Sequence, residues 1–161
     1  MAQSGDFILV CFLDDEPVGK TWERSRRQWP LHVTLVPWFG SADGTTLVSA
    51  LEAVAQRHEQ FIVTLGEPEQ FNENTTVNVL ADQTAVQQLH EDLLNTVETL
   101  GVQLTSTQWV RDAYKAHVTH HDGMRTPTTG ELVDITNFSL VALQPMNQCK
   151  IIQHFNLGSK V

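Results

Sequence analysis

The tripeptide His-Val-Thr occurs twice in this chain of 161 residues, at positions 32–34 and again at positions 117–119. Each copy lies in a short run that is typical of a β-strand, Leu31 to Trp38 and Ala116 to Asp122. Alternate residues of a strand share a face at a spacing of roughly 6.6 Å, so each copy presents an imidazole beside a hydroxyl. Two imidazoles can serve as an acid and a base, and two hydroxyls can hold an anion. These are the groups needed to cleave a phosphodiester without a metal.

The repeat is improbable on composition alone. The chain has 7 His residues, and its Thr and Val content predicts only about 0.08 copies of the tripeptide. His32 and His117 are therefore a candidate acid and base pair. Thr34 and Thr119 are candidate donors to the oxygens of a phosphate. The sequence leaves open which histidine is the base.

The residues around both copies resemble a known family. Leu31 to Phe39 reads Leu-His-Val-Thr-Leu-Val-Pro-Trp-Phe, and Tyr114 to Thr119 reads Tyr-Lys-Ala-His-Val-Thr. The chain is similar to the two-histidine (2H) phosphoesterase superfamily, which includes 2′-5′ RNA ligases and cyclic phosphodiesterases. That family carries His-x-Thr/Ser followed by an apolar residue, once in each half of a single domain. The second copy departs from the pattern, because His120 stands where an apolar residue is usual.

The resemblance implies one domain over residues 1–161 with an α+β fold, in which two pseudo-symmetric lobes with antiparallel sheets and outer helices surround a central cleft. It also implies an enzyme without metal or cofactor that cleaves 2′,3′-cyclic phosphates or 2′-5′ bonds of RNA ends or small nucleotides, or forms such bonds in reverse. One histidine would take a proton from water, and the other would give one to the departing ribose oxygen. A hydrolase of cyclic or oligonucleotide signals would use the same four residues. A non-catalytic nucleotide or RNA-end binder is the alternative of another class.

Aromatic side chains near the two copies indicate a surface on which a nucleotide base could stack. Phe39 and Tyr114 are close to the motifs, Trp38 precedes Phe39, and Phe71 is expected in a loop. Arg111, three residues before Tyr114, is a candidate partner for a phosphate group. We therefore predict that these five residues contribute to substrate binding.

Two further histidines, His120 and His121, extend the second copy to His-x-x-His-His. A zinc site is the alternative interpretation, but zinc takes three or four ligands, and both cysteines lie far away in apolar runs. A regular strand would turn His120 toward the core and place His121 on the face of His117, where it would tune that residue's pKa or touch substrate. We therefore expect no metal site.

The formal net charge of −9 disfavours non-specific binding of long nucleic acid, which needs many cation–phosphate contacts. A nucleotide or strand end remains compatible with that charge. A basic patch precedes the first motif and comprises Lys20, Arg24, Arg26 and Arg27. No apolar run reaches the ~18 residues of a membrane helix, and the first residues show no signal-peptide pattern. With only Cys11 and Cys149 as thiols, both in apolar runs, we expect a monomeric cytoplasmic protein with reduced cysteines and no membrane partner.

The rest of the pattern predicts the elements that position the motifs. Apolar periodicity indicates one helix from Leu47 to His58 after an N-cap at Asp43, and a second from Val86 to Leu100 closed by Gly101. Segments 14–30 and 66–74 are expected to be loops. Further strands are expected at Phe7 to Leu13, Phe61 to Leu65, Thr75 to Leu80, Glu131 to Leu143 and Lys150 to Leu157. This order indicates an α+β fold with largely antiparallel pairing.

Overall fold

The structure, a computed structural model, describes residues 2–26, 28–40 and 43–158. Its strands are β1 (Phe7–Phe12), β2 (Thr21–Glu23), β3 (His32–Gly40), β4 (Phe61–Asn72), β5 (Thr75–Leu80), β6 (Gln103–Leu104), β7 (His117–Thr119), β8 (Leu132–Ile135), β9 (Asn137–Gln144) and β10 (Gln148–Asn156). These ten strands form one sheet in the order β2-β10-β9-β1-β3-β7-β5-β4-β8, with β6 paired to β3. Neighbouring strands are antiparallel, which confirms the predicted pairing.

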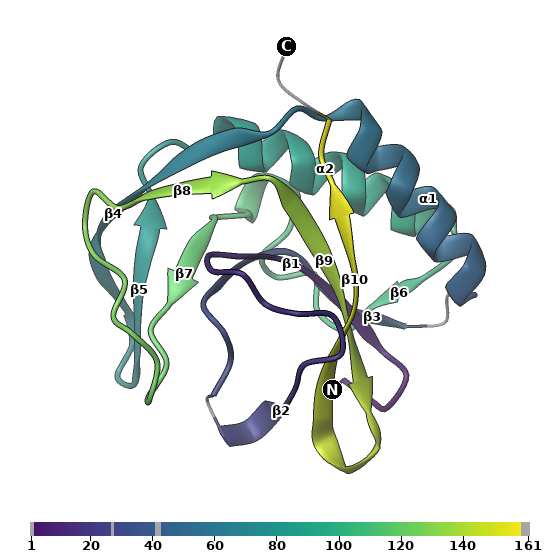
Figure 1. The fold of residues 1–161 in the computed structure, drawn as a ribbon, viewed down its shortest axis with the longest axis horizontal. Helices are drawn as coiled ribbons and strands as arrows, with labels where there is room; N and C mark the ends of the chain where they lie inside the picture. The colour runs from purple at the N-terminus through teal and green to yellow at the C-terminus, as the bar shows by residue number, and fades with distance from the viewer. Residues whose placement is uncertain (1, 27, 41–42, 159–161) are drawn as a thin grey trace.

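Two helices, α1 (Gly44–Arg57) and α2 (Thr84–Thr99), pack on the same face of the sheet (Figure 1). The N-cap prediction is confirmed, because the Asp43 side chain accepts a hydrogen bond from the Thr46 backbone N–H at 3.0 Å. Gly101 follows α2 with a φ of 79°, a conformation that favours glycine and ends the helix. Three single turns complete the regular structure: η1 (Arg24–Arg26), η2 (Arg111–Ala113) and η3 (Pro145–Asn147).

The sheet buries apolar side chains on both faces. On the helix face, a large cluster combines the apolar sides of α1 and α2 with residues of β1, β3, β4, β7 and β9. On the opposite face, a smaller cluster includes Val10 of β1, Trp22 of β2 and Trp29. This second cluster covers only the half of the sheet formed by β1, β2, β9 and β10. It therefore leaves the face of β3 and β7 beside it available for polar residues.

Three segments differ from the sequence-based expectation. The expected loop 66–74 is largely strand, because β4 runs on to Asn72 and pairs with β5 through Asn72 and Thr75. Gly66 allows this pairing, since a Cβ there would lie 2.5 Å from the Val79 carbonyl oxygen. The expected long strand 131–143 divides at Thr136 into β8, which pairs with β4, and β9, which pairs with β1. Segment 14–30, expected to be a loop, contains β2 and η1.

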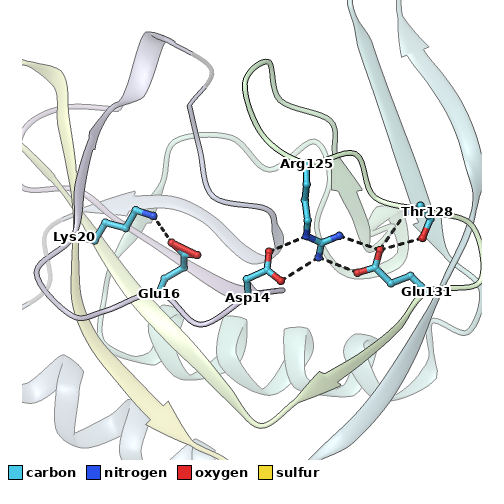
Figure 2. Close-up of polar contacts among 6 residues, drawn as sticks. All are labelled: Asp14, Glu16, Lys20, Arg125, Thr128 and Glu131. Carbon is cyan, nitrogen blue, oxygen red and sulfur yellow. Dashed lines mark hydrogen bonds and ion pairs between the residues drawn. The ribbon is translucent and has the colours of Figure 1, made fainter.

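A charged cluster joins the loop after β1 to the loop that precedes β8 (Figure 2). The Arg125 guanidinium donates to Asp14 at 3.0 and 3.2 Å and to Glu131 at 3.1 and 2.9 Å. Glu131 also accepts from the backbone and hydroxyl of Thr128. These bonds hold the pKa of the Glu131 carboxyl below its usual range and raise that of Arg125. We call these four residues the Arg125 clasp.

The remaining sequence predictions have mixed outcomes. Cys11 and Cys149 are buried free thiols, and burial raises the pKa of each to about 12. Of the basic patch, Lys20 forms an ion pair with Glu16 (Figure 2), whereas Arg27 lies outside the described residues. None of the described helices has the length and apolar character needed to cross a membrane.

Candidate active site

The two His-Val-Thr copies meet at the centre of the sheet, where β3 pairs with β7. Val33 lies opposite Val118 in antiparallel register. Both valines are buried in the cluster beneath the helices. Because successive side chains of a strand point to opposite faces, the histidine and threonine that flank each valine share the other face of the sheet. One paired position thus brings together residues from distant parts of the chain.

The same register fixes which polar residues are neighbours. His32 stands opposite Thr119, and Thr34 stands opposite His117. Directly opposed Cβ atoms are about 4.5–5.5 Å apart in such a ladder, and diagonal ones about 7–8 Å. The two histidines are therefore diagonal neighbours in the ladder.

Each histidine is held by the same backbone bond. His32 Nδ1 lies 2.8 Å from the Pro30 carbonyl oxygen, and His117 Nδ1 lies 2.7 Å from the Lys115 carbonyl oxygen. A carbonyl only accepts, so Nδ1 donates its hydrogen in both cases. This fixes the tautomer and leaves Nε2 of each ring as the atom that can gain or lose a proton. In each copy the acceptor stands two residues before the histidine.

The first histidine has aromatic surroundings. The His32 ring lies 5.1 Å from Trp29, 6.0 Å from His121 and 6.4 Å from Phe12, measured between ring centroids. Burial lowers the pKa of His32 to about 4; the bond to the Pro30 carbonyl opposes this shift, and nearby His121 and His117 lower the pKa further. The ring is therefore neutral at physiological pH.

The second histidine is next to a cavity. The His117 ring lies 4.8 Å from the Phe71 ring, and the Lys115 ammonium lies 5.7 Å from the centre of that same Phe71 ring. Burial lowers the pKa of His117, its bond to the Lys115 carbonyl opposes this, and the Lys115 charge lowers it further. The pKa of His117 falls less far than that of His32. His117 is thus the more easily protonated of the two.

The cavity has a volume of about 350 Å³ and begins at the corner where Thr34 meets His117. Its lining comprises Thr34, Pro37, Phe71, Asn72, Trp109, Tyr114, Lys115 and His117. Among these, Thr34, Phe71, Tyr114 and His117 were predicted as site residues. Trp109 was not, because it stands in an irregular segment without a motif.

Two polar residues that the sequence did not single out, Gln83 and His90, support the residues around the second copy. Gln83 donates to the Ala116 carbonyl at 3.0 Å and accepts from the Ala116 N–H at 2.7 Å, which fixes the residue before His117. The Tyr114 hydroxyl donates to the Thr34 carbonyl at 2.7 Å, and the Tyr114 ring stacks on the His90 ring at 3.9 Å. A histidine among the apolar positions of α2 was the only signal for such a role.

One of the predicted stacking residues, Phe39, is wrong, and a second, Trp38, is not among the residues that line the cavity. Phe39 is fully buried in the cluster beneath the helices, so its ring has no surface for a base. Trp38 is half-buried and packs on Trp29 at 6.2 Å, on the side of the sheet that carries the smaller cluster. Trp29 in turn contacts His32, so Trp38 supports the wall of the site rather than its cavity.

Arg111 is also misplaced by the sequence-based prediction. Its guanidinium donates to Asn95 at 3.0 Å and forms an ion pair with Glu98, both on α2. Its backbone N–H donates to His90 Nε2 at 2.9 Å. Arg111 is not among the residues that line the cavity. It anchors the turn η2 to the helix instead of meeting a phosphate.

The histidines of the second motif point to different partners. His120 Nε2 lies 2.5 Å from the Asn78 side-chain oxygen, in the interior. The His121 ring stacks on the His32 ring, and the regular strand expected to carry His121 is absent there, because β7 ends at Thr119. Among residues 2–26, 28–40 and 43–158, no three His, Cys, Asp or Glu side chains are arranged to hold a metal ion. His120 and His121 are in contact with different residues, Asn78 and His32.

Comparisons with known proteins agree with this geometry. A sequence profile of the 2′-5′ RNA ligase superfamily matches residues 19–134, which is more than half of the chain. No sequence among curated proteins is significantly similar to the chain.

Solved structures share the fold at low sequence identity. TT0787 of Thermus thermophilus superposes with a TM-score of 0.63 at 16% identity, over 97% of this chain and 100% of that one. Escherichia coli LigT complexed with NADP+ gives a TM-score of 0.62 at 15% identity, over 98% and 99%. Kluyveromyces marxianus Usb1 gives 0.51 at 10% identity, over 85% and 93%. With its profile match and its paired His-Val-Thr strands, the chain belongs to the 2′-5′ RNA ligase superfamily of 2H phosphoesterases.

Proposed function

We propose that the protein is a metal-independent phosphodiesterase that opens the 2′,3′-cyclic phosphate of a small nucleotide or an RNA end. The pairing of Val33 with Val118 carries this proposal, because it gathers two oriented imidazoles and two hydroxyls on one face. A pure binding site has no need of two imidazoles with fixed tautomers. E. coli LigT has been solved with 3′-AMP, with ATP and with NADP+, which supports a small nucleotide as the ligand class.

The surroundings of the histidines favour one assignment of roles. His32, neutral because of its burial, takes a proton from the attacking water on Nε2. His117, protonated when the anionic phosphate is bound beside it, gives its Nε2 proton to the departing ribose oxygen. The water oxygen bonds to phosphorus as the bond to that ribose oxygen breaks, which leaves a phosphomonoester on the other ribose oxygen. Product release returns the protons to their starting positions through solvent.

The two threonines act on the phosphate itself. The hydroxyls of Thr34 and Thr119 donate to the non-bridging oxygens, whose negative charge grows in the transition state. Each hydroxyl stands opposite the histidine of the other copy, so both motif strands contribute to the site of the phosphate. All four residues come from one chain, and we accordingly propose that a monomer is active.

The direct test is incubation of the protein with 2′,3′-cyclic AMP in excess EDTA, with the product identified by chromatography. We expect turnover to a single adenosine monophosphate isomer, and we expect His117→Ala to abolish it. Binding of the cyclic nucleotide without turnover would support the non-catalytic alternative. Loss of activity in EDTA with rescue by zinc would overturn the metal-independent mechanism.

A further inference from the structure

Two exposed aromatic side chains border the same cavity. Phe71, near the end of β4, is 42% exposed, and Trp109, in the turn between β6 and η2, is 63% exposed. Among the described residues, six large hydrophobic side chains are exposed, and these two are the aromatic ones. Both line the cavity that begins at Thr34 and His117. An exposed apolar surface that converges on a site typically indicates a ligand.

The walls of this cavity are already fixed. Phe71 contacts the His117 ring on one side and the Lys115 ammonium on another, and Lys115 is bonded to Glu69 at 3.3 Å. Tyr114 is held by its stack on His90 and by its hydroxyl bond to the Thr34 carbonyl. A ligand that enters the cavity would therefore meet prepared surfaces, which lowers the entropy lost on binding.

The lining selects the chemistry of the occupant. It contains no carboxylate, and apart from His117 its one basic group is the ammonium of Lys115. The remaining polar side chains that a base could meet are few, chiefly Asn72 and Thr34. A cavity of about 350 Å³ with aromatic walls is at the lower end of the range for small ligands. It suits a planar, uncharged heterocycle attached to an anion.

The position of the cavity decides which part of the substrate enters it. It is lined by His117 and not by His32, whose ring is enclosed by Trp29, Phe12 and His121. We propose that Phe71 and Trp109 form a nucleobase subsite for the nucleoside whose ribose oxygen departs on the His117 side. This inference rests on the proposed function, since it uses the role of His117 as the acid.

Binding at this subsite should depend on the size and planarity of the base more than on its identity. Stacking on aromatic rings is tolerant of sequence, and its strength grows with the area of the base. Purine nucleotides should therefore bind more tightly than pyrimidine nucleotides, and both should bind more tightly than a ribose phosphate without a base. The few polar groups in the lining give little discrimination between adenine and guanine.

The test is calorimetric binding of adenosine 2′-monophosphate and of methyl riboside 2′-phosphate, which has the same phosphate and sugar but no base. We expect the wild-type protein to bind the adenosine compound more tightly. Trp109→Ala should weaken that binding about 10-fold, as the loss of one stacking ring does, and should leave binding of the base-free compound unchanged. Trp109→Phe should restore most of the difference. Met146→Ala serves as the matched control, since Met146 is 90% exposed and does not line the cavity.

The outcomes separate this inference from the proposed function. If Trp109→Ala and Phe71→Ala both leave the ratio of the two affinities at its wild-type value, or if the wild-type protein binds both compounds equally, the subsite is wrong. Neither result depends on turnover, so it stands apart from the activity assay. Conversely, a base-dependent affinity in a protein that does not hydrolyse 2′,3′-cyclic AMP would keep the subsite as a nucleobase site and overturn the catalytic role.

Discussion

The two copies of His-Val-Thr have the same sequence and the same backbone bond, yet they differ in their surroundings. The first copy is enclosed by rings, with Trp29, Phe12 and His121 around His32. The second copy borders an open cavity and has a lysine beside it. Two copies of the same tripeptide can therefore be given different proton affinities by what packs around them, since burial lowers the pKa of His32 further than that of His117. The asymmetry needed for one base and one acid lies outside the motif.

The largest effect should come from the histidines. His32→Ala and His117→Ala should each lower kcat for 2′,3′-cyclic AMP by about 10²–10⁴, the usual contribution of a positioned acid or base. Bis(4-nitrophenyl) phosphate separates the two roles, because 4-nitrophenolate departs without a proton. With this substrate, the loss of kcat relative to wild type should be at least about 10-fold smaller for His117→Ala than it is with 2′,3′-cyclic AMP. For His32→Ala the loss should be the same with both substrates. The opposite pattern would exchange the roles of the two histidines.

The threonines should have smaller effects that are more alike. Thr34→Ala and Thr119→Ala should each reduce kcat about 10–10³-fold, because each removes one donor to the developing charge. Thr34→Ser and Thr119→Ser keep the hydroxyl and should keep most of the activity, which makes them matched controls for packing. If Thr34→Ala had the kcat of the wild-type protein, the Thr34 hydroxyl would not stabilise the phosphate in the transition state.

The pH profile should also report the difference between the copies. The base must be neutral and the acid protonated, so kcat/KM should rise as pH increases through about 4, the pKa of His32, and should fall above the pKa of His117, which lies below 6.5. The maximum should therefore lie on the acidic side of 6.5.

A bell-shaped pH profile of kcat/KM does not by itself show which histidine is the base, because the reversed assignment gives the same shape. The residual activity of His117→Ala on bis(4-nitrophenyl) phosphate resolves this. If His32 is the base, that activity should rise with pH through about 4 and then stay level. A steady decline over the same range would identify His32 as the acid.

The smallest effect concerns the bond that ties the two copies together. Tyr114→Phe removes the hydroxyl that donates to the Thr34 carbonyl, and should lower stability by about 1 kcal/mol. For a chain of this size that corresponds to a fall in Tm of about 2–4 °C, measurable by thermal unfolding. A Tm equal to that of the wild-type protein would show that water replaces the hydroxyl at no cost.

Sequence reasoning succeeded where the signal was local. Asp43 and Gly101 mark helix ends through bonds within a few residues, and both were predicted. It failed where partners are remote. The polar run after Gly66 is exposed and resembles a loop, but its pairing with β5 makes it strand. At Thr136 the expected single strand divides into β8, which pairs with β4, and β9, which pairs with β1. No local sequence feature marks this change of partner.

The site shows the same division. A repeated tripeptide was enough to single out His32 and His117, and the structure places them on paired strands; their catalytic role stays a prediction. The expected extent of the second motif strand was wrong, because β7 ends at Thr119 and does not reach His121. Trp109 was missed because exposure, which makes it a candidate, is not written in the sequence. Phe39 was predicted as a site residue because it is close to the motif in sequence. Its burial depends instead on the face of β3 to which its side chain points.

The Arg125 clasp makes one part of the molecule sensitive to ionic strength. Arg125 directly follows a tight turn that begins at His121, in which the Met124 N–H donates to the His121 carbonyl at 3.2 Å. The clasp is half exposed, so dissolved salt screens its charges. The walls of the Trp109 cavity include one exposed ion pair, between Lys115 and Glu69, but Tyr114 is held there by ring stacking on His90 and by a neutral hydrogen bond, which salt screens little. Raising the salt concentration should therefore weaken the clasp, whose loop adjoins His121 beside His32, and the Lys115–Glu69 pair, while the stack and hydrogen bond that hold Tyr114 beside the second motif stay as they are.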